Sequence, residues 1–287
     1  MNSVNTVGII GLGLIGGSMA KAVARRTDCV LYGTDASEDI VREAVSDKVL
    51  RGRLEDHYAD IDLLIVALYP SDVVDIILET APKLPRGCIV IDCTGVKQMV
   101  CSRLSSKLDS MGLRFIGGHP MAGKEVRGYA NSSEELYDGA SMILCRDEYT
   151  DEEAFAAACD FFHRLGFSGV KVTDAAEHDA VIAYTSQLAH VASSAYIKSP
   201  TLEKQYGFSA GSFKDLTRVA RLDEEMWADL FLANSGALVK EIDFLTEHLG
   251  EYRDAIARSD RDELVRLLRN GRERKERDEA AEQGRRG

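Results

Sequence analysis

The stretch "VGIIGLGLIGGSMAKAV", residues 7–23, decides the fold of this chain. An apolar run typical of a buried strand leads into a glycine-rich turn, and a helical pattern follows at once. Gly11, Gly13 and Gly16 stand in this turn with G-x-G-x-x-G spacing. The first glycine allows the tight turn, the second lets the backbone approach a pyrophosphate, and the third lets helix and strand pack closely. We therefore expect a dinucleotide to bind along Gly11, Gly13, Leu14, Ile15 and Gly16.

An acidic residue in the right place supports the same prediction. The second expected strand, "VLYGTD", ends in Asp35, nineteen residues after Gly16. A carboxylate there accepts hydrogen bonds from ribose hydroxyls and repels a 2′-phosphate. No arginine directly follows Asp35. The sequence thus predicts NAD, rather than NADP, as the cofactor.

The composition sets limits on what the protein binds. The 287 residues are 45% hydrophobic and 29% charged, as in ordinary globular proteins long enough for two domains. A net charge of −12 argues against nucleic-acid binding, which needs a broad positive face. No apolar run reaches the ~18 residues of a membrane span, and the N-terminus has no leader pattern, so we expect a cytoplasmic protein. The six cysteines form no C-x-x-C pair, so we expect reduced, buried thiols and no metal site.

Strand and helix patterns alternate from about Val4 to Val172, which predicts an α/β domain of the Rossmann type. Several of the expected strands are apolar throughout, as in parallel sheets covered on both faces. We expect helices to start at Ser71 and at a capping box from Thr150 to Glu153. The expected strands are "VGIIG" (7–11), "CVLYGTD" (29–35), "IDLLIVAL" (61–68), "GCIVIDC" (87–93), "LRFIGG" (113–118), "ASMILC" (140–145) and "GVKVT" (169–173).

The pattern changes after Thr173, where long helical stretches without a convincing strand predict an all-α domain. We therefore expect a dinucleotide-binding domain over residues 1–173 and a helical substrate and dimerisation domain over 174–270. The last segment, residues 271–287, holds 11 charged residues and no large apolar side chain. Because it can bury nothing, we expect this tail to fray.

A histidine follows the strand "LRFIGG" at the edge where open α/β sheets place their ligands. Pro120 restricts the backbone beside His119, and the neighbouring glycines are expected to keep the approach open. A neutral imidazole of ordinary histidine pKa held there can accept the proton of a substrate hydroxyl while hydride leaves the same carbon. His119 is therefore the candidate catalytic base.

A helical stretch after Thr173 carries a second group of candidates. Asp179, Ala183, Ser186 and His190 are spaced four, three and four residues apart, so they share one helix face and are expected to line a cleft. Further along, "KDLTRVAR" offers an arginine that could pair bidentately with a carboxylate. Arg218 is the candidate, with Arg221 and Lys214 as close competitors.

Three stretches together resemble the prephenate dehydrogenase family over about residues 4–245. They are "RFIGGHPMAGKE" (114–125), "EHDAVIAYTSQLAH" (177–190) and "GSFKDLTRVARLDEEMWADLF" (211–231). The resemblance implies a nucleotide-binding domain, a helical domain that forms a homodimer, and substrate held between them. It also implies NAD-dependent oxidative decarboxylation of prephenate to 4-hydroxyphenylpyruvate in tyrosine biosynthesis.

The resemblance assigns roles to residues of this chain. His119 matches the catalytic histidine, and Arg218 matches the arginine that binds the substrate carboxylate. Pocket histidines are matched by His178 and His190, and an acidic residue at the pocket mouth by Glu125. Asp215 and Trp227 match a supporting pair in the helical domain.

The chain departs from the family pattern at two places. "DCTGVK" (92–97) has Gly95 where many members carry a serine that contacts both the catalytic histidine and the substrate. We expect Gly95 to line the substrate site, and Thr94, counted among the cofactor contacts, or a water to replace the serine. Lys124 and Arg127 replace small residues, and are expected either to add positive charge for the substrate or to be solvated.

Other functions stay open on the sequence. Arogenate, the aminated analogue of prephenate, is an alternative substrate. A β-hydroxyacid dehydrogenase would share the two-domain plan but needs a catalytic lysine in the helical domain, for which Lys198 and Lys214 are candidates. A non-catalytic NAD-binding sensor is the alternative from a different class.

Overall fold

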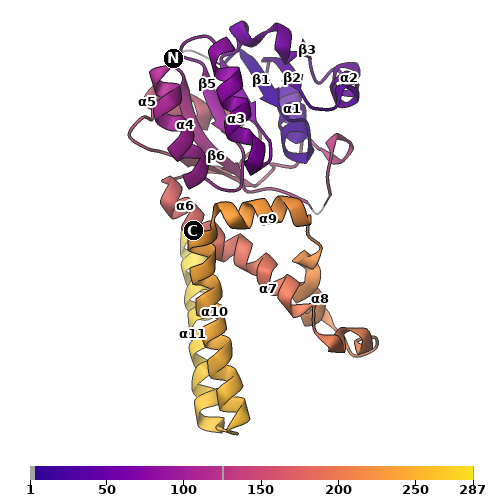
Figure 1. Ribbon diagram of the computed structural model, residues 1–287, viewed down its shortest axis with the longest axis vertical. Helices are drawn as coiled ribbons and strands as arrows, with labels where there is room; N and C mark the ends of the chain where they lie inside the picture. Colours follow the sequence, from indigo (N-terminus) through magenta and orange to yellow (C-terminus); the bar gives the residue numbers. More distant parts are fainter. Residues whose placement is uncertain (1–3, 125, 287) are drawn as a thin grey trace. The chain divides into compact units, whose positions relative to one another are not determined.

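The computed structural model describes residues 4–124 and 126–286. One eight-stranded sheet, which Figure 1 shows among its helices, has the order β3-β2-β1-β4-β5-β6-β7-β8. Its neighbouring strands are parallel except for the pair β6 and β7. The strands are β1 (Thr6–Ile10), β2 (Val30–Thr34), β3 (Gly52–Arg53), β4 (Leu63–Val66), β5 (Ile89–Asp92), β6 (Arg114–Pro120), β7 (Ser141–Cys145) and β8 (Gly169–Thr173). This confirms the predicted Rossmann-type domain.

All seven expected strands are present, and two features of the sheet were not predicted. Strand β3 has only two residues, too few for a hydrophobic pattern. Strand β7 runs antiparallel to β6, because residues 121–140 join the two with no crossover α-helix among the described residues. A connection of that kind returns the chain beside the strand it has just left.

Helices cover both faces of the sheet. On one face lie α1 (Leu14–Arg26), α2 (Glu38–Ser46) and α5 (Glu152–Arg164), whose apolar side chains share a buried cluster. A second cluster on the other face contains side chains of α3 (Pro70–Thr80) and α4 (Gln98–Ser110). The sheet edge at which β1, β4, β5 and β6 end is left for the turns that carry the candidate residues.

Two expected helix starts are wrong by one or two residues. The N-cap of α3 is Tyr69, with Pro70 as the first helical residue, so Ser71 already lies inside the helix. The N-cap of α5 is Asp151, whose side chain accepts a hydrogen bond from the Ala154 amide at 2.8 Å. Proline at the first helical position and aspartate at the N-cap are both favoured there, and these preferences outweigh the serine and threonine signals.

The chain forms two compact units, which divide between Ser235 and Gly236. The first unit contains the sheet, α6 (Ala175–Ile182), a π-helical turn (Ala183–Gln187), α7 (Leu188–Tyr196), α8 (Gly211–Thr217) and α9 (Glu224–Ala233). The second unit is a helical hairpin of α10 (Ser235–Ala257) and α11 (Arg261–Arg286). None of the helices in the described part of the chain is both long and apolar enough to span a bilayer.

The charged tail is helical, contrary to the expected fraying. Helix α11 continues through it to Arg286, and the side chains described from 271 onward are exposed, as their polarity requires. Ion pairs between successive turns, such as Arg272 with Glu276 and Lys275 with Glu279, support this helix. Alanine, glutamate, lysine and arginine are also strong helix formers, so burial is not needed to keep the segment helical.

All six cysteines are free thiols, as predicted. Four of them, Cys88, Cys93, Cys101 and Cys145, are buried, whereas Cys29 and Cys159 are partly exposed. Burial raises the pKa of Cys88, Cys93 and Cys145 to about 12. These thiols are part of the apolar core.

The N-cap of α5 can be tested by substitution. We expect Asp151→Ala to lower the free energy of unfolding by about 1 kcal/mol, because an amide in the first turn loses its acceptor. Asp151→Asn keeps the acceptor and should cost much less. Urea titrations followed by circular dichroism measure both, and equal losses would contradict the assignment.

Candidate active site

The glycine turn between β1 and α1 has the geometry its sequence predicts. Gly11 has a φ of +87°, and a Cβ there would lie 2.4 Å from the Ala67 carbonyl oxygen. A Cβ on Gly16 would lie 1.8 Å from the Gly11 carbonyl oxygen. Only glycine fits either position, so the close approach of α1 to the turn depends on both.

Gly13 differs from the other two glycines because it faces open space. A Cβ on Gly13 would have no atom of the described structure within 4 Å. Gly13 is also the N-cap of α1, and it has no side chain to cap the first-turn amides of Leu14 and Ile15. Open space in front of the N-terminus of a long helix fits a phosphate group. The residues present therefore fit the pyrophosphate of a dinucleotide.

The acidic residue after β2 is fixed beside this turn. Asp35 Oδ2 accepts a hydrogen bond from the Leu12 amide at 2.7 Å, and Oδ1 accepts one from the Ser37 amide at 2.9 Å. The two amide donors thus orient its carboxylate next to the glycines, where a ribose would bind.

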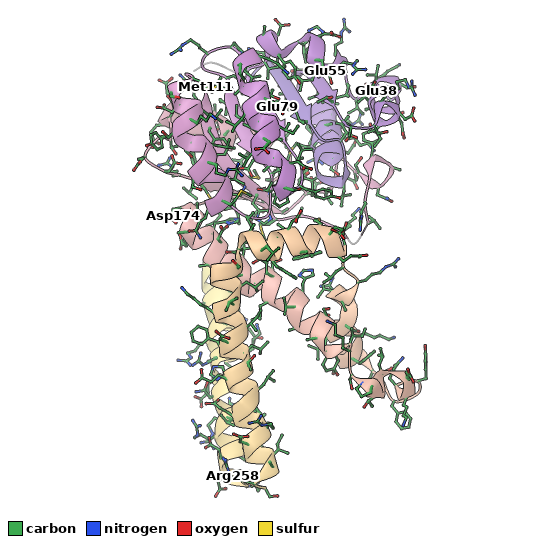
Figure 2. The ribbon with its side chains drawn as sticks, in the orientation of Figure 1. Glu38, Glu55, Glu79, Met111, Asp174 and Arg258 are labelled. Atoms are coloured by element: carbon green, nitrogen blue, oxygen red, sulfur yellow. The ribbon has the colours of Figure 1, made fainter. Side chains whose placement is uncertain are left out.

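A cation near the end of β2 is already engaged by acids. Arg53 forms an ion pair with Glu38 and lies 3.5 Å from a carboxylate oxygen of Glu55, and Figure 2 labels both acids. The Thr34 hydroxyl donates to Glu55 at 2.5 Å. With its charge balanced in this way, Arg53 is poorly placed to attract a 2′-phosphate, which agrees with a preference for NAD.

His119 lies at the end of β6, as predicted, but its pKa is not the ordinary one that we expected. A hydrogen bond of 2.9 Å joins its Nδ1 to His178 Nε2. Burial, together with the neighbouring His178 and Lys97, lowers the pKa of His119 well below 6.5. The imidazole is therefore neutral at pH 7, the state in which it can accept a proton.

The other ring nitrogen of His119 faces Gly95. A Cβ on Gly95 would lie 3.9 Å from His119 Nε2 and 3.1 Å from Leu230 Cδ2 of α9. A side chain at position 95 would therefore occupy the space in front of Nε2 and press on Leu230. Glycine at this position avoids both contacts.

His178 lies behind His119, which argues against the predicted contact with substrate. Its side chain is fully buried, and both ring nitrogens are occupied. His178 Nδ1 donates to Asp179 Oδ1 at 2.7 Å. Asp179 Oδ1 also accepts from the Lys97 amide at 2.7 Å, and Oδ2 accepts from the Gln98 amide at 2.8 Å. The sequence placed His178 and Asp179 on the pocket helix but did not predict their link to α4.

A buried ion pair near His119 forms hydrogen bonds with the hydroxyl of Thr94. Lys97 and Asp92 are both fully buried and form a salt bridge. Thr94 Oγ1 donates to Asp92 Oδ2 at 2.6 Å and accepts from Lys97 Nζ at 3.1 Å. Since Thr94 is committed to this pair and 3% exposed, it does not replace the missing serine. The signal for this ion pair in the sequence is the single lysine, Lys97, at the end of an apolar stretch just before α4.

The glycine pair before His119 serves packing rather than access. A Cβ on Gly118 would lie 2.6 Å from the Asp92 carbonyl oxygen, and one on Gly117 would lie 2.7 Å from Cys101 Sγ. The Gly118 amide also donates to Asp92 Oδ1 at 3.3 Å. The two glycines thus let β6 lie against the buried aspartate, contrary to our expectation that they keep the approach to His119 open.

The predicted helix face is interrupted by the π-helical turn, which contains Ser186. His190 Nδ1 donates to the Ser186 carbonyl at 2.9 Å, and its ring stacks on Trp227 with centroids 3.8 Å apart. Among the four residues of the predicted helix face, Asp179 and Ala183 are fully buried, whereas Ser186 and His190 are partly exposed.

Arg218 and its neighbours lie on the helical side of the site. Arg218 begins a 3₁₀ turn after α8, is exposed, and its turn packs against α7, the helix that carries His190. Asp215 is exposed on α8. Lys198 and Lys214, the candidates for a β-hydroxyacid dehydrogenase, are exposed as well.

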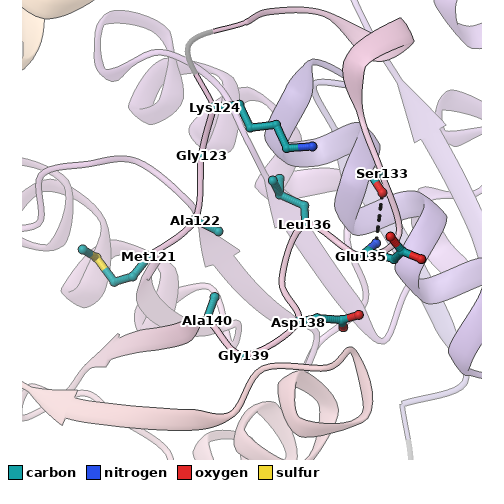
Figure 3. A pocket seen from close by; sticks show the side chains of 10 residues that line it. All are labelled: Met121, Ala122, Gly123, Lys124, Ser133, Glu135, Leu136, Asp138, Gly139 and Ala140. Atoms are coloured by element: carbon teal, nitrogen blue, oxygen red, sulfur yellow. Dashed lines mark hydrogen bonds between the residues drawn. The ribbon is translucent and has the colours of Figure 1, made fainter. Parts of the chain in front are cut away.

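The two cations of the loop after Pro120, Lys124 and Arg127, have different surroundings. Arg127 forms an ion pair with Asp223, the N-cap of α9, so it ties the loop to α9 instead of adding free positive charge. Lys124 is exposed and lines a pocket of about 430 Å³ that also contains Ser133, Glu135 and Leu136 (Figure 3). Neither His119 nor Gly95 lines that pocket. Glu125 lies outside the described residues.

Comparison with known proteins agrees with this geometry. Residues 19–171 match the family model "Prephenate dehydrogenase, nucleotide-binding domain", and residues 174–270 match "Prephenate dehydrogenase, dimerization domain". A cyclohexadienyl dehydrogenase of Zymomonas mobilis is 32% identical over 273 residues, which are 90% of this chain and 91% of that protein.

Two solved structures extend the likeness to the whole fold. The prephenate dehydrogenase of A. aeolicus, in complex with hydroxyphenyl propionate and NAD+, is 27% identical with a TM-score of 0.84, over 96% of this chain and 98% of that one. Arogenate dehydrogenase of Synechocystis is 25% identical with a TM-score of 0.80, over 95% of this chain and 99% of that one. With a glycine turn whose open helix N-terminus fits a pyrophosphate, a histidine of lowered pKa at the end of β6 and both family domains matched, the chain belongs to the prephenate dehydrogenase family of NAD-dependent oxidoreductases.

Proposed function

We propose that this protein oxidises and decarboxylates prephenate to 4-hydroxyphenylpyruvate, with NAD as the oxidant. The observation that carries the proposal is the neutral imidazole of His119, whose Nε2 lies beside Gly95 at the end of the sheet. A base is needed there because the reaction removes a hydroxyl proton from the ring carbon that loses hydride.

In this mechanism His119 Nε2 accepts the hydroxyl proton of prephenate. NAD, when bound, supplies the acceptor for the hydride that leaves the same carbon. The bond from the opposite ring carbon to its carboxylate breaks, carbon dioxide leaves, and the electron pair completes the aromatic ring. Because aromatisation favours the step, a positioned base of modest strength suffices, and it contributes roughly 10²–10⁴-fold.

We propose that NAD binds along Gly11, Gly13, Leu14, Ile15 and Gly16, with Asp35 at its adenosine ribose. The open N-terminus of α1 would receive the pyrophosphate. Asp35, already oriented by two backbone amides, would accept hydrogen bonds from the ribose hydroxyls.

For the substrate, we propose Arg218 as the partner of a carboxylate. A planar guanidinium suits a carboxylate because it donates two parallel hydrogen bonds. Gly95, His190 and the backbone of Ser186 would line the pocket, and Glu125 would stand at its mouth. His178 leaves this group because its ring is buried behind His119.

Arogenate is a second candidate substrate. The likeness to an arogenate dehydrogenase and to a cyclohexadienyl dehydrogenase supports it. Arogenate differs from prephenate only in the side chain, so the chemistry at His119 would be unchanged. Discrimination would therefore depend on residues that contact that side chain.

We further propose a homodimer formed through the helical region, as the name of the matching dimerisation domain suggests. Exposed apolar side chains such as Phe244 and Leu249 on α10 would gain from burial. The six free cysteines fit a reducing, cytoplasmic compartment.

Absorbance of NADH tests the proposed reaction directly. We expect rapid NADH formation when the purified protein is mixed with NAD and prephenate, and little with NADP. Arogenate, assayed in parallel, ranks the two substrates. If neither substrate yields NADH although NAD binds by calorimetry, the protein is instead a sensor of the cofactor.

The pH dependence of kcat tests the role of His119. Because burial lowers the pKa of His119 well below 6.5, the base stays neutral through pH 6.5, and activity should fall only at lower pH. His119→Asn should lose at least about 10²-fold in kcat and the acidic limb with it. A variant that kept the wild-type rate and limb would refute the assignment.

Substitutions of the turn glycines should separate effects on NAD binding from effects on the stability of the fold. Gly13→Ala adds a methyl group into open space, so it should leave stability almost unchanged while weakening NAD binding. Gly16→Ala places its methyl group against the Gly11 carbonyl and should destabilise the protein as well. Calorimetric Kd values and thermal unfolding measure both effects; normal NAD affinity in Gly13→Ala would contradict the proposed site.

A further inference from the structure

We propose that Asp179 and His178 are positioning residues that hold the hydrogen of His119 on Nδ1 and thereby keep Nε2 free as the base. This inference rests on the proposed role of His119. It concerns a chain of hydrogen bonds that runs from the N-terminus of α4 through two side chains of α6 to the end of β6.

The direction of the hydrogen bonds is set at α4. The Lys97 and Gln98 amides can only donate, and they donate to the two carboxylate oxygens of Asp179 at 2.7 and 2.8 Å. Both carboxylate oxygens of Asp179 therefore act as acceptors of amide hydrogens. Asp179 can then only accept from its third partner, His178.

Each step of the chain fixes the next. His178 Nδ1 must carry a hydrogen to donate to Asp179 at 2.7 Å, so the Nε2 atom of a neutral His178 carries a lone pair. That lone pair accepts from His119 Nδ1 at 2.9 Å. In a neutral His119, the hydrogen on Nδ1 leaves Nε2 as the acceptor, and Nε2 is the atom that faces Gly95.

The chain of hydrogen bonds is rigid because its side chains are buried and held by further contacts. His178 and Asp179 are 2% and 0% exposed. The Asn234 side chain donates to the Asp179 carbonyl and to the Gln187 side chain, each at 2.8 Å. Gln187 in turn donates to the Leu230 carbonyl at 3.2 Å. Asn234 and Gln187 thus join Asp179 to α9, whose Leu230 borders the space in front of the base.

The charged groups around His119 are consistent with a neutral ring. Lys97 faces it from the start of α4, but the charge of Lys97 is balanced by Asp92 at the end of β5. His178 faces it from α6. A proton placed on His119 would meet two cationic or potentially cationic neighbours in a buried setting.

Substitutions at position 178 test the proposal. His178→Gln retains an acceptor for His119 Nδ1, whereas His178→Leu removes it. We expect kcat to fall about 10- to 100-fold in His178→Leu, with an unchanged Kd for NAD, and to be largely restored in His178→Gln. Both variants lose the imidazole ring that lowers the pKa of His119, so the acidic limb of their pH–rate profiles should move to higher pH. His248→Leu, which removes a histidine paired with Glu251 on the exposed side of α10, is the matched control.

Asp179→Asn probes the origin of the chain. An amide must present its NH2 group to at least one of three donors, so one hydrogen bond is lost whichever way it turns. We expect a lower kcat with the fold retained by circular dichroism.

Nitrogen-15 NMR of ring-labelled histidine provides a readout that needs neither NAD nor substrate. In the wild-type protein, His119 Nε2 should show the shift of a nitrogen without hydrogen, and His178→Leu should mix the two tautomers. Wild-type Nε2 that carries the hydrogen, or equal kcat values for His178→Gln and His178→Leu, would overturn the proposal. A wild-type protein with the expected tautomer but no turnover would instead refute the proposed reaction.

Discussion

The carboxylate of Asp179 is the interaction on which the site depends. It accepts from two amides of α4 and from His178, so one buried group connects the dinucleotide-binding sheet with the helical segment that follows it. If this contact were broken, two amide donors and a histidine would be left buried without an acceptor, at a cost of about 1–3 kcal/mol for each group. The base, its partner and the pocket helix are therefore positioned together, as a consequence of folding.

At the sheet edge that carries His119, a buried ion pair fixes the local backbone geometry. Lys97 and Asp92 are wholly inaccessible, and such a pair is weak evidence for stability because desolvation offsets its attraction. What the pair does supply is shape: Asp92 also holds the Gly118 amide and the Thr94 hydroxyl. The backbone just before His119 and the loop that carries Gly95 are thereby held by one aspartate.

Sequence patterns predicted the sheet and the glycine turn because these depend on local rules. Gly11, Gly16 and Asp35 have fixed spacing, and long apolar runs mark buried strands. The direction of β7, the helical tail and the burial of His178 could not be predicted in this way. The first depends on a β6–β7 connection whose described residues form no crossover helix, and the second on ion pairs between turns. The third depends on contacts between residues some sixty to eighty positions apart.

The distribution of cysteines has a consequence for the chemistry of the folded protein. A thiol attacks alkylating and oxidising reagents only as the thiolate, and pKa values of about 12 leave Cys88, Cys93 and Cys145 protonated throughout the physiological range. The native chain is thus largely inert toward such reagents, apart from the two cysteines that are partly exposed, and it becomes reactive once the core opens. Thiol labelling would then record unfolding residue by residue, with Cys93 reporting on the strand end next to the base.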